Sequence, residues 1–172
     1  MNKPESRNKL RLNLTAGYEN SSHKNIGKMI DISEKPVVRR EAVAEGKINL
    51  KPSTMQLINK GLIEKGDPIQ IALIGAIQAV KSTSRNLKMC HPIAVESSSV
   101  EFSKTEDSIT ARATVVAFAK TGVEMEALNA VANALLNVWD VVKKYEKDTN
   151  GQYPSTAITD IHVVRKKKEG SY

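Results

Sequence analysis

The stretch GVEMEALNAVANALLNVWDVVKK, residues 122–144, determines how the rest of this chain is arranged. It begins with a glycine and two carboxylates and continues as a long helical pattern to Lys147. Along it, apolar residues recur at alternating steps of three and four: Leu128, Val131, Leu135, Val138 and Val142. This spacing predicts a helix that buries one face on a hydrophobic core.

A second stripe on the same helix is polar and consists of Glu126, Asn129, Asn133, Asn137 and Asp140. The amides fit either a solvated face or a helix–helix seam in an oligomer. Asp140 and Lys143 lie three residues apart and can therefore touch. As an exposed pair they would contribute only about 0.2–0.5 kcal/mol, whereas beside a substrate they could exchange protons.

The composition indicates one domain of ordinary size. The 172 residues are 40% hydrophobic but only 4% aromatic, so Ile, Val, Leu, Ala and Met must build the core. Cys90 is the single cysteine, which excludes an intramolecular disulfide and a four-cysteine metal site. We find neither an apolar run long enough to span a membrane nor a signal-peptide core in residues 1–28. These features predict a cytoplasmic protein with no membrane partner.

The net charge of +7 is concentrated at the two ends of the chain. Residues 1–28 carry +4 and residues 161–172 carry +3, while residues 29–160 are neutral. Basic ends on a neutral body are more typical of solvated ends than of a nucleic-acid platform. We therefore expect a basic, flexible extension (1–27) that could hold a short strand at 9–14, a folded domain (28–165) and a basic tail (166–172).

Further elements follow from periodicity and turn signals. The expected strands are 47–51, 100–103, 108–118 and 156–164, and the expected helices are 52–60, 69–80 and 128–147. Residues 29–33 alternate like an extended arm, which Pro36 and the Arg39–Arg40 pair interrupt. The order strand, helices, two strands, helix, strand predicts an α+β fold: a ferredoxin-like antiparallel sheet with helices packed on one face.

Other candidate functional residues lie outside the long helix. Lys65 and Lys81 flank the helix at 69–80 and could bind an anion, although a lysine at a helix end usually extends into solvent. A glycine-rich phosphate loop is absent, so side chains and loop amides would hold a phosphate. His91 could bind a ligand or serve only the turn before Pro92. The residue spacing supports no metal site, and the residues alone indicate an acid–base site.

Five short motifs resemble, in order and spacing, those of the cyclic pyranopterin monophosphate synthases, the C proteins of molybdenum cofactor biosynthesis. They are KGD (65–67), IQAVK (77–81), CHP (90–92), KTGVEMEAL (120–128) and DVVK (140–143). The nine-residue KTGVEMEAL run is highly specific. Residues 29–33 and Arg40 resemble the start of the family's domain, so the resemblance covers about residues 29–165.

The resemblance implies a ferredoxin-like lyase that converts 3′,8-cyclo-7,8-dihydro-GTP to cyclic pyranopterin monophosphate and releases diphosphate. It implies a nucleotide-derived small-molecule substrate, no cofactor and no nucleic-acid partner; a divalent ion with the triphosphate is not indicated. It further implies a homo-oligomer, a hexamer made of three dimers, with each site at a dimer interface.

The motifs also imply roles for particular residues. Asp140 would be the catalytic acid–base group with Lys143 as its partner, and Lys65 and Lys81 would bind the triphosphate or assist proton transfer. The residues implied to line the substrate pocket are Met89, Cys90, His91, Glu124, Met125 and Glu126. With the sites at an interface, Lys65, Lys81 and His91 would reach Asp140 across a subunit boundary, and the amide stripe would face the neighbouring subunit.

Some residues depart from the family pattern. Leu73 stands where many members carry an arginine, and the sequence around Lys88 and Met89 also differs. The family's glycine-rich, lysine-containing tail is absent, and residues 165–170 either take over its lysine function or do not. Residues 1–27 match nothing in the family. These differences concern the phosphate contacts rather than the reaction.

Two alternative functions are less consistent with the sequence. The first is a non-catalytic α+β module that binds nucleotide or RNA through its basic tails. Nucleic-acid-binding sheets usually display stacking aromatics, and Phe102 and Phe118 are the only phenylalanines here. The second is a structural homologue without activity. The joint presence of Asp140, Lys143, Lys65 and Lys81 argues against it.

Overall fold

The computed structural model of the chain describes residues 27–170. Its elements are β1 (Val38–Asn49), α1 (Pro52–Asn59), α2 (Pro68–Asn86), β2 (Ser97–Lys104), β3 (Ser108–Ala119), α3 (Glu124–Glu146) and β4 (Ala157–Glu169). The expected flexible extension, with its short strand at 9–14, lies outside the described residues apart from Gly27.

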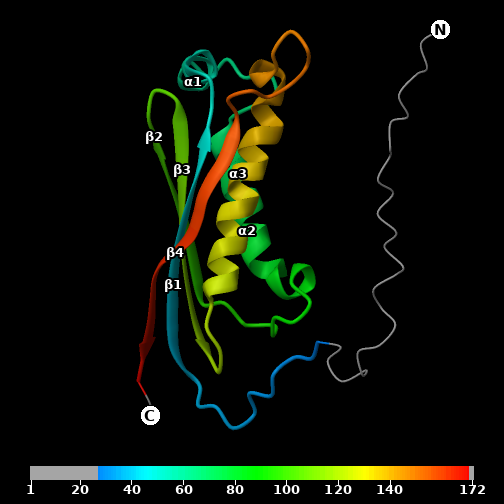
Figure 1. The fold of residues 1–172 in the computed structure, drawn as a ribbon. Coiled ribbons are helices and arrows are strands. Elements are labelled where there is room, and N and C mark those ends of the chain that lie inside the picture. The colour runs from blue at the N-terminus through cyan, green and yellow to red at the C-terminus, as the bar shows by residue number, and fades with distance from the viewer. Residues whose placement is uncertain (1–26, 171–172) are drawn as a thin grey trace, which may run out of the picture.

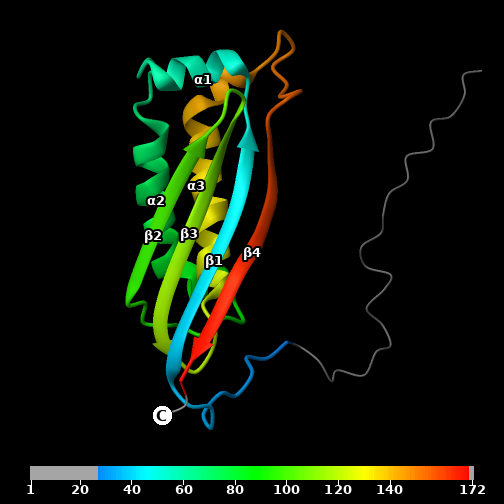
Figure 2. The same cartoon turned by 90° about the vertical axis from the view of Figure 1, so that its left-hand side faces the viewer.

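The four strands form one antiparallel sheet in the order β2-β3-β1-β4. Helices α2 and α3 run along one face of this sheet, and α1 crosses near one end (Figures 1 and 2). Chain order and sheet order together give the ferredoxin-like arrangement. The predicted α+β fold with helices on one face is therefore confirmed. Among residues 27–170, no helix is long and apolar enough to cross a membrane.

Small residues allow α3 to lie close to the sheet. The face of α3 that was predicted to be apolar contributes fully buried side chains at Val131, Leu135, Val138 and Val142. Opposite it, β1 and β3 present fully buried alanines. A Cβ at Gly46 of β1 would lie 2.8 Å from Ile161 Cγ1 and 2.9 Å from Val131 Cγ1. These separations are too short for a side chain, so glycine is required where α3 and β4 both approach β1.

The amide stripe of α3 faces α2 of the same chain. Asn129 Nδ2 donates to the Ala79 carbonyl at 2.8 Å, and Asn133 and Asn137 each donate to the carbonyl four residues earlier. A Cβ at Gly75 of α2 would lie 2.5 Å from Asn137 Nδ2, so the two helices approach closely. Asn129 and Asn137 thus contact α2 of the same chain, whereas all three amides remain partly exposed, and the expectation that the stripe also faces a neighbouring subunit stays a prediction.

All four strands extend beyond the bounds that the sequence pattern indicated, and the residues added to β1 and β4 include charged ones. The Arg39–Arg40 pair does not interrupt β1, because Arg39 forms 3.0 Å hydrogen bonds to Glu41 and to Glu169 of β4. The last strand was expected to end at residue 164, but β4 continues to Glu169. Its lysines pair across to β1, with Lys168 opposite Arg40. Residues 166–169, which we assigned to a basic tail, are therefore part of the sheet.

Candidate active site

A three-residue ion cluster lies near the carboxyl end of α3. The loop before α2 turns at Gly66, whose φ is 106°, and Asp67 caps α2 by accepting a 2.8 Å hydrogen bond from the Ile69 amide. This turn directs Lys65 onto Asp140: Lys65 Nζ donates to Asp140 Oδ2 at 2.9 Å and to the Asp140 carbonyl at 3.0 Å. Lys143 Nζ donates to Asp140 Oδ1 at 2.6 Å. We call Lys65, Asp140 and Lys143 the ion cluster.

The charges in the ion cluster reinforce one another. The hydrogen bond from Lys143, followed by that from Lys65, lowers the pKa of Asp140 to about 2. The hydrogen bond to Asp140 in turn raises the pKa of Lys143. At neutral pH the cluster is thus a carboxylate between two ammonium groups. The Asp140 side chain is 57% exposed, so a substrate can reach all three groups.

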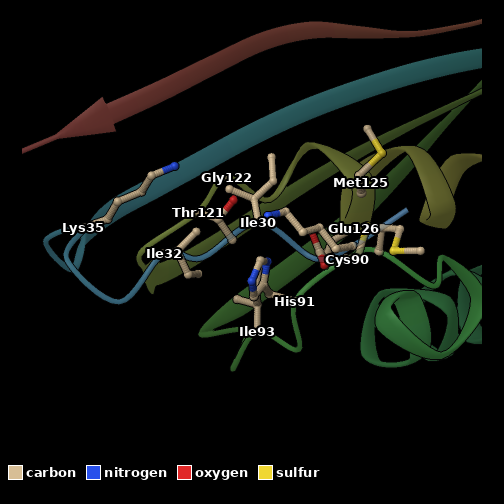
Figure 3. Close-up of a pocket in the computed structure, with 12 residues that line it drawn as sticks. Ile30, Ile32, Lys35, Cys90, His91, Ile93, Thr121, Gly122, Met125 and Glu126 are labelled. Atoms are coloured by element: carbon tan, nitrogen blue, oxygen red, sulfur yellow. The ribbon is translucent and has the colours of Figure 1, made fainter. Parts of the chain in front are cut away.

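A pocket of about 290 Å³ lies at the opposite end of α3 (Figure 3). Three segments form it: the arm before β1, the connection after α2, and the first turn of α3. Five of the residues implied by the resemblance line it, namely Met89, Cys90, His91, Met125 and Glu126. We call this cavity the α3 N-terminal pocket.

Glu126 is the most unusual group in the α3 N-terminal pocket. Its side chain is buried, with the residue only 3% exposed, and Oε2 has no hydrogen-bond partner among residues 27–170. Burial raises the pKa of Glu126, and neighbouring Glu124 raises it further. Burial also raises the pKa of the Cys90 thiol, with Glu126 adding to the effect. A buried carboxyl without a partner is costly unless a ligand supplies one.

Glu124 lies in a neighbouring basic groove rather than in the α3 N-terminal pocket. This groove of about 230 Å³ is lined by Arg40, Glu41, Gly122, Val123, Glu124 and Lys166–Lys168, and it shares Gly122 with the pocket. Lys166 Nζ donates to Glu124 Oε1 at 3.0 Å. Arg40 donates to the Ala119 and Lys120 carbonyls, both at 3.4 Å. The end of β4, expected to be a solvated tail, thus supplies cations beside the start of α3.

Lys81 lies apart from both groups. It borders a third hollow, of about 360 Å³, between the end of α2 and the start of β2. Within one chain it meets neither Asp140 nor Glu126. Lys65, by contrast, contacts Asp140 in the same chain, so the expectation that it arrives across a subunit boundary is wrong.

The ion cluster and the α3 N-terminal pocket are separated by the length of α3. Glu126 and Asp140 are fourteen residues apart on one helix. At about 1.5 Å of rise per residue this corresponds to roughly 21 Å along the axis. A molecule held at the pocket of one chain would have to span roughly this distance to reach the ion cluster of the same chain.

Sequence reasoning missed the contribution of the arm. Ile30, Ile32 and Lys35 line the α3 N-terminal pocket. The arm is held in place because Lys120 Nζ donates to the Ser33 carbonyl at 2.6 Å and Asp31 accepts from the Ser33 amide at 2.8 Å. The alternation of apolar residues at 29–33 was the sequence signal for this contact, because it places Ile30 and Ile32 on the same side of the arm. Within the described part of the chain, no group of three or more His, Cys, Asp or Glu residues is placed to hold a metal ion.

A ferredoxin-like fold with a carboxylate between two lysines defines a protein suited to acid–base chemistry on an anionic molecule. A model of the MoaC family matches residues 29–170, and the chain belongs to this family. A probable cyclic pyranopterin monophosphate synthase of Sulfolobus acidocaldarius is 54% identical over 140 residues, covering 81% of this chain and 98% of that protein.

Two further relatives show the same level of similarity. A probable cyclic pyranopterin monophosphate synthase of Thermococcus kodakarensis is 50% identical over 141 residues, covering 82% of this chain and 90% of that protein. A protein of Methanothermobacter thermautotrophicus described as a probable cyclic pyranopterin monophosphate synthase accessory protein is 51% identical over 141 residues, covering 82% and 89%.

The lowered pKa of Asp140 predicts a specific pH dependence of stability. Because the pKa falls from 3.8 to about 2 on folding, the ionised carboxylate stabilises the folded state above pH 3.8, and this contribution is lost as the pH falls towards 2. The difference in unfolding free energy between the parent and Asp140→Asn should therefore be constant near neutral pH and shrink between pH 4 and 2. Urea unfolding at a series of pH values measures it.

Lys65→Met is the matched variant for this measurement, because it removes one of the two ammonium groups and leaves Lys143 in place. Its loss of stability on acidification should also begin near pH 3.8 but should be smaller and be complete at a higher pH than in the parent, because the pKa of Asp140 in the folded state then lies closer to 3.8. A parent and an Asp140→Asn protein with parallel curves down to pH 3 would contradict the assignment of the ion cluster.

Proposed function

We propose that this protein is a cyclic pyranopterin monophosphate synthase, a lyase of molybdenum cofactor biosynthesis that acts in the cytoplasm. It converts 3′,8-cyclo-7,8-dihydro-GTP to cyclic pyranopterin monophosphate and releases diphosphate. Membership of the MoaC family over residues 29–170 supports this assignment. The observation that carries it in the structure is the ion cluster, which holds Asp140 between Lys65 and Lys143.

The ion cluster performs the proton transfers. Remodelling a purine-derived ring system requires protons to be removed and added at several atoms. Asp140, whose pKa the two lysines lower to about 2, is ionised at neutral pH and orients their ammonium groups toward the substrate. Lys143, whose pKa is raised, is charged and acts as the proton donor. Lys65 supports both and helps to stabilise the negative charge that develops as diphosphate leaves.

The α3 N-terminal pocket holds the ring system. Ile32, Ile93 and the thioethers of Met89 and Met125 give it apolar walls that suit the faces of a flat heterocycle. Glu126 provides an unsatisfied carboxyl oxygen for the ring's polar edge. Cys90 and His91 lie on the same wall and complete the polar lining.

The basic groove holds the phosphate chain. It adjoins the α3 N-terminal pocket at Gly122, so one ligand can occupy both hollows. Arg40, Lys166 and Lys168 bring positive charge to the groove. Lys166 and Lys168 would then take over the lysine function of the family's glycine-rich tail, which this chain lacks.

Each complete site is assembled from two copies of the chain. The separation of about 21 Å along α3 prevents one copy from supplying both ends to one substrate. Apolar side chains remain exposed on the outward faces of the two long helices, with Ile74 at 67%, Leu136 at 56% and Met125 at 39%. Such residues are expected where another subunit packs. The assembly is a hexamer of three dimers in which the α3 N-terminal pocket of one copy meets the ion cluster of its partner, and Lys81 approaches from a neighbouring copy.

Removing either central group of the ion cluster should stop the reaction. Lys143→Ala and Asp140→Asn should each lower product formation by at least about 100-fold, because each removes one side of the proton-transfer pair. The assay supplies 3′,8-cyclo-7,8-dihydro-GTP and measures cyclic pyranopterin monophosphate and diphosphate. Lys144→Ala is the control, since Lys144 is exposed and its contacts among residues 27–170, with the Glu64 carboxylate and the Tyr145 ring, lie outside the ion cluster.

Near-normal turnover by a correctly assembled Lys143→Ala protein would overturn the assignment of this residue. A parent protein that binds the substrate but forms no product would instead favour the non-catalytic module.

Two inactive variants should restore activity when they are co-expressed, provided that they affect different ends of α3. Glu126→Gln alters the α3 N-terminal pocket and Asp140→Asn alters the ion cluster. Random pairing gives half of the dimers one intact site out of two, so about a quarter of the parent activity should return. Asp140→Asn with Lys143→Ala is the matched control and should restore none, because both changes affect the ion cluster. No restoration in the first pair would mean that each site belongs to one copy.

A further inference from the structure

Lys65 reaches Asp140 from the end of a short segment, residues 51–65, that includes α1. This helix has only eight residues, Pro52–Asn59, and the chain turns after it at Gly61, whose φ is 67°. Lys51 occupies the position before the helix, and its side chain makes no capping bond within the described structure. Isolated helices of this length are not stable. The position of Lys65 therefore depends on what holds the two ends of the segment.

The first end of the segment is held by Glu146. This carboxylate is fully buried, and each of its oxygens lies 3.2 Å from the Lys51 amide nitrogen. Thr156 Oγ1, just before β4, donates to it at 2.5 Å. Lys51 Nζ donates back to the carbonyls of Tyr145 and Lys147 at 3.3 and 2.9 Å. A buried carboxylate without hydrogen-bond partners strongly destabilises the folded state. The bonds from Lys51 and Thr156 to Glu146 therefore hold the start of the segment firmly on α3.

The far end of the segment is held by Tyr145, the residue before Glu146. Its hydroxyl accepts a 3.1 Å hydrogen bond from the Glu64 amide, one residue before Lys65. Lys144 also pairs with the Glu64 carboxylate, but both side chains are more than half exposed. Exposed ion pairs contribute little to structure, whereas a bond to a backbone amide fixes the path of the chain.

We infer that Tyr145 and Glu146 are positioning residues that fix both ends of segment 51–65 on α3 and thereby keep Lys65 in contact with Asp140. Neither side chain belongs to the ion cluster, so each acts through Lys65. The inference rests on the proposed function, which gives the ion cluster its role. Met55, Ile58 and Ile63 anchor the same segment in the core, so the fold is maintained when one polar attachment is removed.

Tyr145→Phe is the most direct test, because it removes one oxygen atom and keeps the ring. The position of Lys65 is read from the protonation of Asp140 at pH 3.5, measured by carbon-13 NMR of protein with labelled aspartate carboxyls. A looser Lys65 should increase the protonated fraction, because its hydrogen bond helps to lower the pKa of Asp140. The same variant should lower kcat roughly 3- to 10-fold and change KM less than about twofold.

Three further variants complete the experiment. Glu146→Gln tests the first end of the segment and should act in the same direction as Tyr145→Phe. Asn59→Ala is the matched control: it removes the hydrogen bond from Lys104 to the end of α1, which does not involve α3, and should change neither readout. Lys65→Ala gives the largest increase in Asp140 protonation to expect, against which the effects of Tyr145→Phe and Glu146→Gln are compared.

The inference is overturned if Tyr145→Phe and Glu146→Gln match the parent in Asp140 protonation while Lys65→Ala does not. Normal turnover by Lys65→Ala despite a shifted Asp140 would contradict the proposed role of Lys65. The positioning role would then still be judged by the NMR readout, so the two failures are distinguishable.

Discussion

The length of α3 is the constraint on which the arrangement of the functional residues depends. This helix is one element of 23 residues, Glu124–Glu146, and it packs along its length against α2, β1 and β3. Gly46 leaves room for Val131 and Ile161 to approach β1, and Gly75 leaves room for the Asn137 amide, so α3 packs closely against the sheet and α2. The α3 N-terminal pocket and the ion cluster are therefore held about 21 Å apart. A site that needs both ends must combine two copies of the chain.

The two ends of α3 provide opposite environments for a carboxyl group. Asp140 is exposed and lies between two lysines, which lower its pKa to about 2. Glu126 is buried without a partner for one of its oxygens among residues 27–170, and this burial raises its pKa. Paired carboxyl groups whose pKa values are moved apart serve different tasks in catalysis. We propose that in this protein the end with Asp140 moves protons and the end with Glu126 recognises the ring.

Much of this could be predicted from sequence, and the failures have physical causes. The apolar period of α3, the hairpin and the order of elements predicted the fold, because each is a local pattern. The ends of β1 and β4 were wrong because Arg39 and Lys168 find partners across the sheet, which local charge does not reveal. The amide stripe of α3 indicated a helix–helix contact, but not that α2 of the same chain provides it at Asn129. Lys65, Asp140 and Lys143 were candidates from their motifs, and the spacing predicted the contact of Asp140 with Lys143. The contact of Lys65 with Asp140, by our inference, depends on Tyr145 and Glu146, which no sequence motif marked.

The central claim is that one substrate is shared between two copies of the chain. A crystal structure of Lys143→Ala with 3′,8-cyclo-7,8-dihydro-GTP tests it most directly. The account predicts a ring system in contact with Glu126 of one copy, and Asp140 of the partner subunit within hydrogen-bond distance of the same molecule. A substrate bound entirely by residues of a single copy would contradict it.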